Sequence, residues 1–471
     1  MKWEMVIGLE THVELATETK IFCSCTTKFG GEPNTHCCPI CMGHPGSLPF
    51  LNRKAVEYAV MAGLALNCEI NEISKMDRKH YVYPDLPKAF QISQYDLPLC
   101  LGGYVMLSSG KRINLNRIHL EEDAGKLIHE NGKMLMDYNR GGVPLIEVVS
   151  EPDLSNAQEA VEYLETLQLI LRTIGVSDCR MQEGSMRCDV NISVREKGSP
   201  VLGTKAEVKN LNSFTAVQAA IEYEFARQSE ILEQGGKIQQ ETLHFRAATG
   251  ETISMRDKEN ADDYRYFREP DITAILVTPD DIAALRERLP ELPAVRIARY
   301  VNDYKLTEQD AGLLCKYKRV SDFFEAALSG TNNPKTVAAF ILTQMFSLIS
   351  TEVEREKWET PIPPEYLRDL VLLLDSNKIN HNLAKIIMVK MLETGNDPES
   401  VMKAEGISTT EAILIDALCA NAIEANPAAA EDYRKGKEKA LQALIGNVMR
   451  QSKGRADAEE AKKILIDLLK G

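Results

Sequence analysis

Apolar and polar residues alternate in several segments of the first 290 residues, and this period of two predicts β-strands with one buried face. One such strand covers residues 5–15. Its apolar side is formed by Ile7, Leu9, Val13 and Leu15. The other side carries Glu10, His12 and Glu14, which a simple antiparallel sheet would expose to solvent.

Two further segments argue against the interpretation that the polar face of residues 5–15 is simply exposed to solvent. In residues 143–149, Glu147 stands on a face that is otherwise apolar, where a core residue is expected. Residues 187–195 alternate throughout, and their polar face consists of Arg187, Asp189, Asn191, Ser193 and Arg195. A buried carboxylate needs a partner or a cation, and carboxylates with one imidazole suit a hard ion such as Mg²⁺.

Residues 117–126 add three acidic side chains, Glu121, Glu122 and Asp123, at the end of another predicted strand. Alternation groups Glu121 with His119 and Glu122 with Leu120, so one glutamate of the pair faces the site unless a bulge shifts the register. Parity alone does not choose between Glu121 and Glu122.

Helical periodicity predicts two helices in this first part and dominates the chain beyond about residue 291. One helix runs from Ser155 to Gly175, with Ser155 and Gln158 as a capping box, and the other from Ser213 to about Gln234. The predicted fold class is α+β. A mostly antiparallel-sheet cradle domain covers residues 1–291, a helical domain covers 292–405 and a small helical tail covers 406–471.

Composition narrows the class of protein. The 471 residues include 55 Lys and Arg against 69 Asp and Glu, a net charge of −14, which argues against a surface that is basic throughout. No apolar run approaches the roughly 18 residues that cross a bilayer, and the N-terminus lacks the apolar segment of a secretory signal. These features predict a cytoplasmic protein with no membrane partner.

Cysteines cluster near the N-terminus. Two short pairs, Cys23 with Cys25 and Cys38 with Cys41, predict a tetrahedral structural Zn²⁺ site inserted at about residues 23–41. Cys37 could replace Cys38, although Cys38 has the better spacing to Cys41. The alternative is a chance cluster of free thiols. The scattered cysteines are expected in the core, and they are Cys68, Cys100, Cys179, Cys188, Cys315 and Cys419.

Three loops combine aromatic and charged residues. In residues 77–95, Arg78, Lys79 and Lys88 could hold an anionic ligand, and the alternative is a loop rich in tyrosine and proline that packs on the sheet. Residues 205–213 and 262–267 have the same mixed character and the same two interpretations.

The acidic total conceals a basic end, because residues 432–471 hold ten Lys and Arg against six Asp and Glu. Six of these bases flank an apolar helical pattern and could contact a phosphate backbone. They are Lys435, Lys437, Lys439, Arg450, Lys453 and Arg455. The alternative is an ordinary solvated helix surface.

Seven segments together closely resemble the B subunits of the aspartyl/glutamyl-tRNA(Asn/Gln) amidotransferases, the GatCAB family. They are VIGLETHVEL (6–15), DRKHYVYPDLPKAFQISQYD (77–96), IHLEEDAGK (118–126), NRGGVPLIEVVSEPD (139–153), GSMRCDVNIS (184–193), KAEVKNLNSF (205–214) and DDYRYFREPDI (262–272). The resemblance spans nearly the whole chain, and residues 406–471 look like the YqeY-like tail of those proteins.

The resemblance implies an ATP-dependent ligase of translation. The side-chain carboxylate of Glu-tRNA(Gln) or Asp-tRNA(Asn) would be activated as an acyl phosphate and then amidated by ammonia. A glutaminase partner, the A component of GatCAB, would supply the ammonia from glutamine, and the small C component would stabilise the pair. The implied cofactors are ATP and Mg²⁺. Many family members lack the four cysteines, so the expected Zn²⁺ would be a structural clip with no catalytic role.

The resemblance also implies roles for particular residues. The catalytic set would be Glu10, His12, Lys79, Glu122 and Glu147. Glu10, His12, Glu147 and one of Glu121 and Glu122 would ligate Mg²⁺. Lys79 would contact phosphate and Asp189 would lie near a second cation. Further cofactor-binding candidates are Glu207, Lys209, Asn210 and Ser213.

Two other functions stay open at this point. One is a non-catalytic tRNA-binding scaffold with solvated acidic strands, and Glu147 argues against it. The other is an unrelated metal-dependent hydrolase of a small acid, and the basic tail argues against that one.

Overall fold

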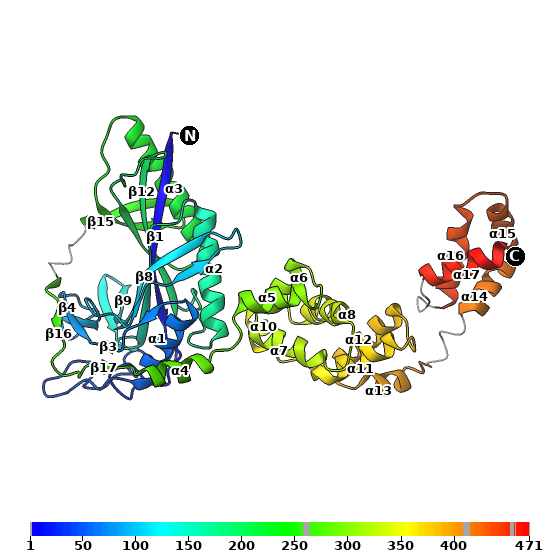
Figure 1. Cartoon of the computed structure of the whole chain (residues 1–471), viewed down its shortest axis with the longest axis horizontal. Helices are drawn as coiled ribbons and strands as arrows, with labels where there is room; N and C mark the ends of the chain where they lie inside the picture. Colours follow the sequence, from blue (N-terminus) through cyan, green and yellow to red (C-terminus); the bar gives the residue numbers. More distant parts are fainter. Residues whose placement is uncertain (1, 258–263, 408–414, 453–455, 457, 471) are drawn as a thin grey trace. The chain divides into compact units, whose positions relative to one another are not determined.

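The computed structural model describes residues 2–257, 264–407, 415–452, 456 and 458–470. The chain divides into two compact units, Met1–Leu292 and Pro293–Gly471. Strands occur in the first unit, and the described residues of the second unit form helices and connecting loops, so the prediction of an α+β fold is confirmed (Figure 1). The predicted separation of a tail at residue 406 stays a prediction.

A ten-stranded sheet forms the frame of the first unit. Its order is β15-β14-β13-β12-β1-β11-β8-β6-β2, with β7 paired to β8, and all neighbours are antiparallel except β13 and β14. The strands are β1 (Trp3–Glu14), β2 (Glu69–Ile70), β6 (Cys100–Leu101), β7 (Tyr104–Met106), β8 (Arg112–Glu122), β11 (Pro144–Ser150), β12 (Met186–Glu196), β13 (Ala206–Leu211), β14 (Glu241–Arg246) and β15 (Glu251–Asp257).

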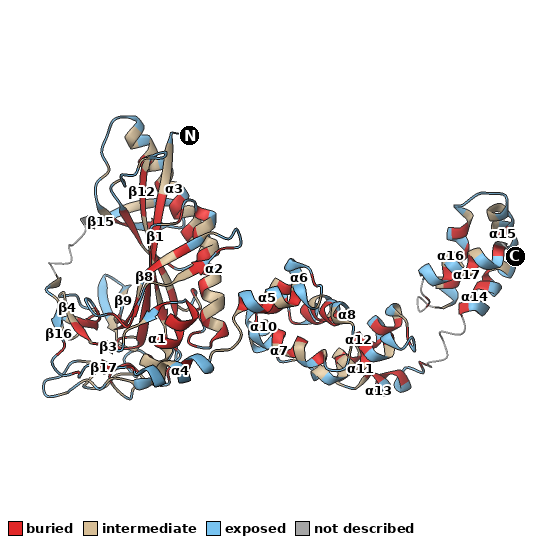
Figure 2. Ribbon diagram, in the orientation of Figure 1, coloured by how far each residue is buried: buried red, intermediate tan, exposed pale blue. Residues whose placement is uncertain are grey.

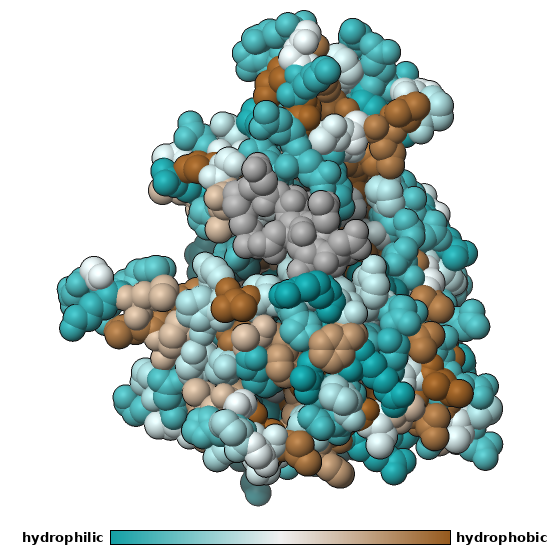
Figure 3. All heavy atoms as spheres, turned by 90° about the vertical axis from the view of Figure 1, so that its left-hand side faces the viewer, coloured by the Kyte–Doolittle hydropathy of each residue, from teal (hydrophilic) through white to brown (hydrophobic). Residues whose placement is uncertain are grey.

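Three small sheets accompany this frame: β16-β4-β5, β10-β9 and β17-β3. Their strands are β3 (Ile73–Ser74), β4 (Asp77–His80), β5 (Phe90–Ser93), β9 (Lys126–Glu130), β10 (Lys133–Asp137), β16 (Phe267–Arg268) and β17 (Ile275–Leu276). The side of the molecule that carries β4, β15 and β16 is mostly hydrophilic, with separate small hydrophobic patches (Figure 3).

Helices α1 (Arg53–Ala65), α2 (Ala157–Thr173), α3 (Phe214–Glu233) and α4 (Pro279–Glu287) complete the first unit. The predicted Ser213 start of α3 is confirmed, because the Ser213 side chain accepts a hydrogen bond from the Ala216 amide. The predicted capping box of Ser155 and Gln158 is wrong. Asn156 caps α2 by accepting from the Glu159 amide, and its extended backbone brings the side chain over the first turn.

The apolar faces of the central strands are buried against these helices. Ile7, Leu9 and Val13 of β1 are at most 1% exposed and belong to one hydrophobic core with residues of β12, α2 and α3. Figure 2 shows the buried residues along β1 and β12 and on the helices beside them. Because side chains alternate along a strand, burial of this apolar face turns the acidic face of β1 away from the hydrophobic core.

The second unit contains two separate hydrophobic clusters, one within residues 300–407 and one within residues 415–469. Its helices are α5 (Pro293–Asn302), α6 (Glu308–Cys315), α7 (Lys318–Ala327), α8 (Pro334–Phe340), the π-helical turn η2 (Ile341–Met345), α9 (Phe346–Leu348), α10 (Glu352–Lys357), α11 (Pro364–Asp375), α12 (His381–Thr394), α13 (Pro398–Ala404), α14 (Ile415–Ala425), α15 (Pro427–Arg434), α16 (Ala440–Gln451) and α17 (Ala458–Lys470). Among the described residues, no helix has both the length and the apolar character needed to span a membrane.

Candidate functional site

The polar faces of β1, β8, β11, β12 and β13 meet at a cavity of about 280 Å³. Side chains from β4, β5 and the segment before β16 close its other walls. Its lining residues are Glu10, His12, Lys79, Ser93, Gln94, Tyr95, Arg117, His119, Glu147, Asp189, Glu207, Lys209, Thr242, Tyr264 and Tyr266. The cavity therefore gathers carboxylates, imidazoles and lysines from segments far apart in the sequence.

One group of ligand atoms forms where β1, β11 and β8 lie side by side. The register pairs His12 with Glu147 and Glu147 with His119. The His12 Nε2 atom lies 3.6 Å from Glu121 Oε1 and 3.5 Å from Glu147 Oε2. His119 Nε2 lies 3.2 Å from Glu147 Oε2. Ligand atoms of His12, Glu121 and Glu147 all lie within 4.8 Å of one another, so these three residues could hold one metal ion.

A second group contains Glu10, Asp189 and Glu207, whose carboxylate oxygens also lie within 4.8 Å of one another. Lys209 Nζ contacts two of them, 3.0 Å from Asp189 and 2.9 Å from Glu207. The Asn210 amide donates to Asp189 Oδ1 at 2.9 Å, and the backbone of Asn210 there has a φ of 57°. Burial raises the pKa of Glu10, and the nearby carboxylates of Glu147 and Glu207 add to the effect. Three carboxylates carry more negative charge than one lysine neutralises, which favours a cation there.

Strand geometry explains why Glu10 and His12 fall in different groups. Strand β1 lies between β12 and β11, and the register pairs Glu10 with Asp189 of β12 but His12 with Glu147 of β11. The expectation of a single metal site that contains both residues stays a prediction. In the structure they belong to two neighbouring groups.

The imidazoles and carboxylates of the first group stabilise one another's charges. Burial works to lower the pKa of His12, but Glu147 and Glu121 outweigh it and raise the pKa to about 9. The same opposition raises the pKa of His119 to about 9. Burial works to raise the pKa of Glu147, and the two imidazoles overcome it and hold that pKa well below its usual value. Glu147 is therefore an anion, as a metal ligand must be, whereas His12 would lose a proton on binding a metal ion.

Lys79 is the cation of residues 77–95 that lines the cavity. Burial favours its neutral form, but Tyr266, Glu121 and Glu147 raise its pKa above the usual value, so it stays charged. The other two basic residues are held elsewhere. Arg78 forms a bidentate pair with Glu269, and Lys88 Nζ donates to both carboxylate oxygens of Glu122. Of the three proposed anion contacts, the structure brings only Lys79 into the site.

Four other predicted residues do not line the cavity, namely Glu121, Glu122, Asn210 and Ser213, although Glu121 and the Asn210 amide contact residues that do. Glu122 accepts from both Lys88 Nζ, at 2.5 Å, and the Ile92 amide, at 2.9 Å, so it points away from Glu121 as strand parity requires. Ser213 is the cap of α3. The structure thus places Glu121 of the acidic pair beside His12 and Glu147.

Several cavity residues were not among the predicted site residues. His119 could have been found from sequence, because it shares strand parity with Glu121 and with Arg117. For Ser93, whose hydroxyl donates to Glu121 at 3.0 Å, and for Tyr95, Tyr264 and Tyr266, the sequence indicated only the two loops that contain them, with binding and packing both open. Tyr95 and Tyr266 stack with ring centroids 4.3 Å apart, which only the tertiary structure brings about.

Glu14, at the end of β1, makes the stability of the fold depend on pH. Burial raises its pKa to about 8, and the neighbouring Asp123 adds to the effect. The folded state therefore keeps a proton that the unfolded chain loses near pH 4.5, so this group's contribution to stability falls as pH rises from about 4.5 to 8. Glu14→Gln should leave stability unchanged near pH 4 and raise it by at least about 1 kcal/mol above pH 8.

Urea unfolding at several pH values measures this difference. The control is Glu4→Gln on the same face of the same strand, where the hydrogen bond from Arg195 lowers the glutamate pKa, so no gain at high pH is expected. An equal gain in both variants would contradict the assignment to Glu14.

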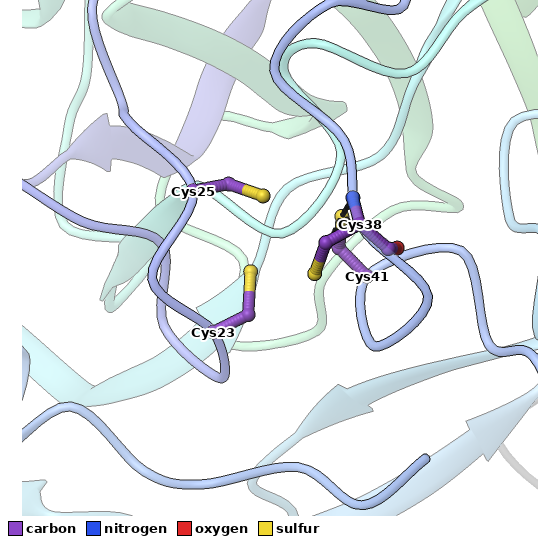
Figure 4. A group of neighbouring side chains, drawn as sticks. All are labelled: Cys23, Cys25, Cys38 and Cys41. Atoms are coloured by element: carbon purple, nitrogen blue, oxygen red, sulfur yellow. Dashed lines mark hydrogen bonds between the residues drawn. The ribbon is translucent and has the colours of Figure 1, made fainter. Parts of the chain in front are cut away.

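The four predicted zinc ligands come together in the loop after β1. Their sulfur atoms lie within 4.8 Å of one another, and Figure 4 shows Cys23 and Cys25 facing Cys38 and Cys41. Cys41 Sγ lies 4.0 Å from Cys38 Sγ, close to the roughly 3.8 Å between sulfurs of a tetrahedral site with 2.3 Å Zn–S bonds. Cys37 is not part of the group. The residues present fit a structural zinc ion.

Local hydrogen bonds shape both arms of this cysteine group. A bridge between Thr19 and Thr26 closes the first arm, and the Lys20 amide donates to the Cys25 carbonyl at 2.9 Å. In the second arm the Cys38 amide points at Cys41 Sγ, 3.2 Å away. The other cysteines, Cys68, Cys100, Cys179, Cys188, Cys315 and Cys419, are buried as predicted.

Basic residues lie at both ends of α16. Lys435, Lys437 and Lys439 precede the helix, Arg450 lies in its last turn, and all four are exposed. Twelve residues of helix separate the two ends by about 18 Å. The remaining two predicted tRNA contacts, Lys453 and Arg455, lie outside the described residues.

Comparison with known proteins places the whole chain in one class. Residues 5–283 match the family model of the GatB/GatE catalytic domain, and residues 322–469 match that of the GatB domain. The first match covers the sheet and both acidic groups. The cavity therefore lies within a domain whose family is described as catalytic.

Full-length relatives agree with the domain matches. The chain is 52% identical to the aspartyl/glutamyl-tRNA(Asn/Gln) amidotransferase B subunit of Thermoanaerobacter pseudethanolicus over the whole of both chains. It is 49% identical to the same subunit of Carboxydothermus hydrogenoformans over 99% of both chains, and 46% identical to the second B subunit of Clostridium acetobutylicum over all of both. The chain belongs to the family of aspartyl/glutamyl-tRNA(Asn/Gln) amidotransferase B subunits.

Proposed function

We propose that this protein is the component of a glutamine-hydrolysing, tRNA-dependent amidotransferase that activates and amidates the amino acid on mischarged tRNA. The observation that carries the proposal is the pair of acidic groups at one cavity, His12 with Glu121 and Glu147, and Glu10 with Asp189 and Glu207, of which all but Glu121 line it. The relatives' name supports Glu-tRNA(Gln) and Asp-tRNA(Asn) as substrates. The A and C components of GatCAB would be its partners in the cytoplasm.

The proposed reaction has two steps. An oxygen of the substrate's side-chain carboxylate attacks the γ-phosphorus of ATP, which forms an acyl phosphate and releases ADP. Ammonia from the glutaminase partner then attacks the acyl carbon, phosphate leaves, and the nitrogen loses a proton to give the amide. Two negatively charged reactants meet in the first step, so cations and positioning should supply most of the rate enhancement.

The residues of the cavity fit these needs. His12, Glu121 and Glu147 would hold one Mg²⁺, and Glu10, Asp189 and Glu207 a second cation, which would neutralise charge on the phosphates. Lys79, still charged when buried, would contact a phosphate oxygen. Lys209 and the Asn210 amide keep Asp189 in place. Glu122, with Lys88, would act by positioning the strand that carries Glu121.

The cysteine group would hold a structural Zn²⁺. It lies outside the lining of the cavity, so it would stabilise the loop between β1 and α1 and take no part in the chemistry.

The basic ends of α16 would contact the tRNA backbone. Replacing Lys435, Lys437 and Lys439 by glutamate should weaken tRNA binding at least about tenfold in roughly 100 mM salt and make the affinity less dependent on salt, because fewer counterions are released on binding. Filter binding at several salt concentrations measures both effects. Deleting residues after 405 should weaken binding at least as much.

A control for this experiment is the same charge reversal at Lys385, Lys390 and Lys403, on α12 and α13. It changes the net charge equally and should leave the salt dependence as it was. If both triple variants lose the same affinity, net charge rather than the basic ends of α16 determines binding.

The function is tested with the purified complex of this chain and its two partner proteins. Transfer of the labelled γ-phosphate of ATP to Glu-tRNA(Gln) or Asp-tRNA(Asn), followed by formation of the amide when glutamine is added, is the expected result. A non-catalytic scaffold would bind the tRNA but show no transfer that depends on His12 or Glu147, and that outcome would overturn the proposal.

A further inference from the structure

Lys20 is a buried cation whose charge has no acidic partner among the residues that the structure describes. The residue is 0% exposed, and its Nζ atom donates to the Tyr138 carbonyl at 3.1 Å. Among the described residues, no carboxylate lies within 4.0 Å of this ammonium group. Burying an unpaired ammonium group is strongly unfavourable, so a negative charge is expected nearby.

The cysteine group is what the ammonium faces. Lys20 Nζ lies 3.8 Å from Cys41 Sγ, and the Cys38 amide points at the same sulfur atom. Four thiolates around one Zn²⁺ carry a net charge of −2, which would lie beside the buried lysine. The two charges match, because the lysine has no carboxylate partner among the described residues and a four-thiolate zinc centre is negatively charged.

The stem of Lys20 is fixed by the segment that leads into β11. A Cβ atom on Gly142 would lie 3.5 Å from Lys20 Cδ and 3.6 Å from Cys41 Cβ, so the Gly142 backbone packs against both side chains. The Ile21 amide donates to the Gly142 carbonyl at 2.9 Å. Lys20 is thus held on both its backbone and its side chain in the position that faces Cys41.

We propose that Lys20 is the charge-balancing and positioning residue of the zinc site, with its ammonium group offsetting the negative charge of the four-cysteine zinc centre. This inference rests on the zinc site of the proposed function. It adds that zinc binding and burial of Lys20 depend on each other. It also adds a charged contact, from Lys20 to the Tyr138 carbonyl, to the hydrogen bonds that join the zinc loop to residues 138–142.

The test uses the full-length chain and measures zinc itself. Zinc affinity of the purified protein is followed by competition with a chromophoric chelator, and Co²⁺ replaces zinc as a spectroscopic probe of four-thiolate ligation. Lys20→Met removes the charge and the hydrogen bond, whereas Lys20→Gln removes the charge but keeps a donor for the Tyr138 carbonyl. Both should bind zinc about 10–100-fold more weakly, the loss usual for residues that support metal ligands.

Two matched variants complete the design. Lys20→Arg keeps the positive charge and should restore most of the affinity, which a purely space-filling role would not predict. Lys28→Met removes an exposed lysine of the same loop and should bind zinc as the unchanged protein does.

The outcomes separate this inference from the zinc site itself. If the unchanged protein binds one zinc and Lys20→Gln binds it equally tightly, the role of Lys20 is overturned and the zinc site stands. If the unchanged protein takes up no zinc, the zinc site and the inference both fall. Should Lys20→Met not fold, Lys20→Gln and Lys20→Arg still decide the question, since they differ in charge while both retain a donor.

Discussion

Glu147→Gln should lower the rate of amidation of charged tRNA at least about 100-fold, while the glutaminase activity of the complex persists. The substitution keeps the size of the side chain but removes the negative charge that both His12 and His119 contact. It would take one anionic ligand from the proposed Mg²⁺ site, and metal ligands and their charge commonly contribute several kcal/mol to phosphoryl transfer. The labelled transfer of γ-phosphate to tRNA measures the effect directly.

The matched control is Glu151→Gln, one residue beyond the end of β11. Its carboxylate accepts from Asn116 and does not line the cavity, so amidation should be nearly unchanged. His12→Ala should resemble Glu147→Gln. Full amidation by His12→Ala and Glu147→Gln would contradict the assignment of the first metal group.

Cys41→Ser should remove zinc and lower the melting temperature by about 5–10 °C. Structural zinc stabilises the fold by its binding free energy, and a loss of about 2–4 kcal/mol in a domain of this size corresponds to such a shift. The whole binding energy is not lost, because only the loop of residues 19–44 depends on the metal. Differential scanning calorimetry with zinc analysis of the same sample measures both quantities.

Cys37→Ser is the control that separates the two adjacent cysteines. Cys37 lies outside the group of four, so the variant should keep one zinc and the unchanged melting temperature. Equal zinc loss in both variants would mean that the ligands are exchanged between Cys37 and Cys38. A normal melting temperature of zinc-free Cys41→Ser would show that the loop does not need the metal.

Strand alternation predicted much of the site. Alternate residues of a strand point to opposite faces, so the same pattern predicts both the buried apolar face and the acidic face. It correctly grouped Ile7, Leu9 and Val13 in the core and left His12 and Glu147 facing the cavity. The start of α3 and its cap at Ser213 were also predictable from sequence, because a cap depends only on residues of the first turn. The cap of α2 was predicted at Ser155 but is Asn156, because both neighbouring side chains are able to cap the same first turn.

Other features depended on distant partners. Glu121 and Glu122 were equivalent in the sequence, and Lys88 and the Ile92 amide, about 30 residues away in the chain, hold Glu122 outside the cavity. The separation of Glu10 from His12 into two groups followed from which strand lies on each side of β1. On one side β12 and β13 supply Asp189 and Glu207, and on the other β11 and β8 supply Glu147 and Glu121.

By itself the sequence determined what each strand and turn offers: an acidic face, two cysteine pairs, a basic tail and the family to which these segments belong. Only the tertiary structure decided which of these groups meet, because strand order, register and loop packing depend on contacts between residues distant in the chain. The neighbours of Lys20 illustrate this most clearly. A lysine in a loop carries no sign of such a role in the sequence, and only the contacts with Tyr138, Gly142 and Cys41 suggest it as a partner for the proposed zinc ligands.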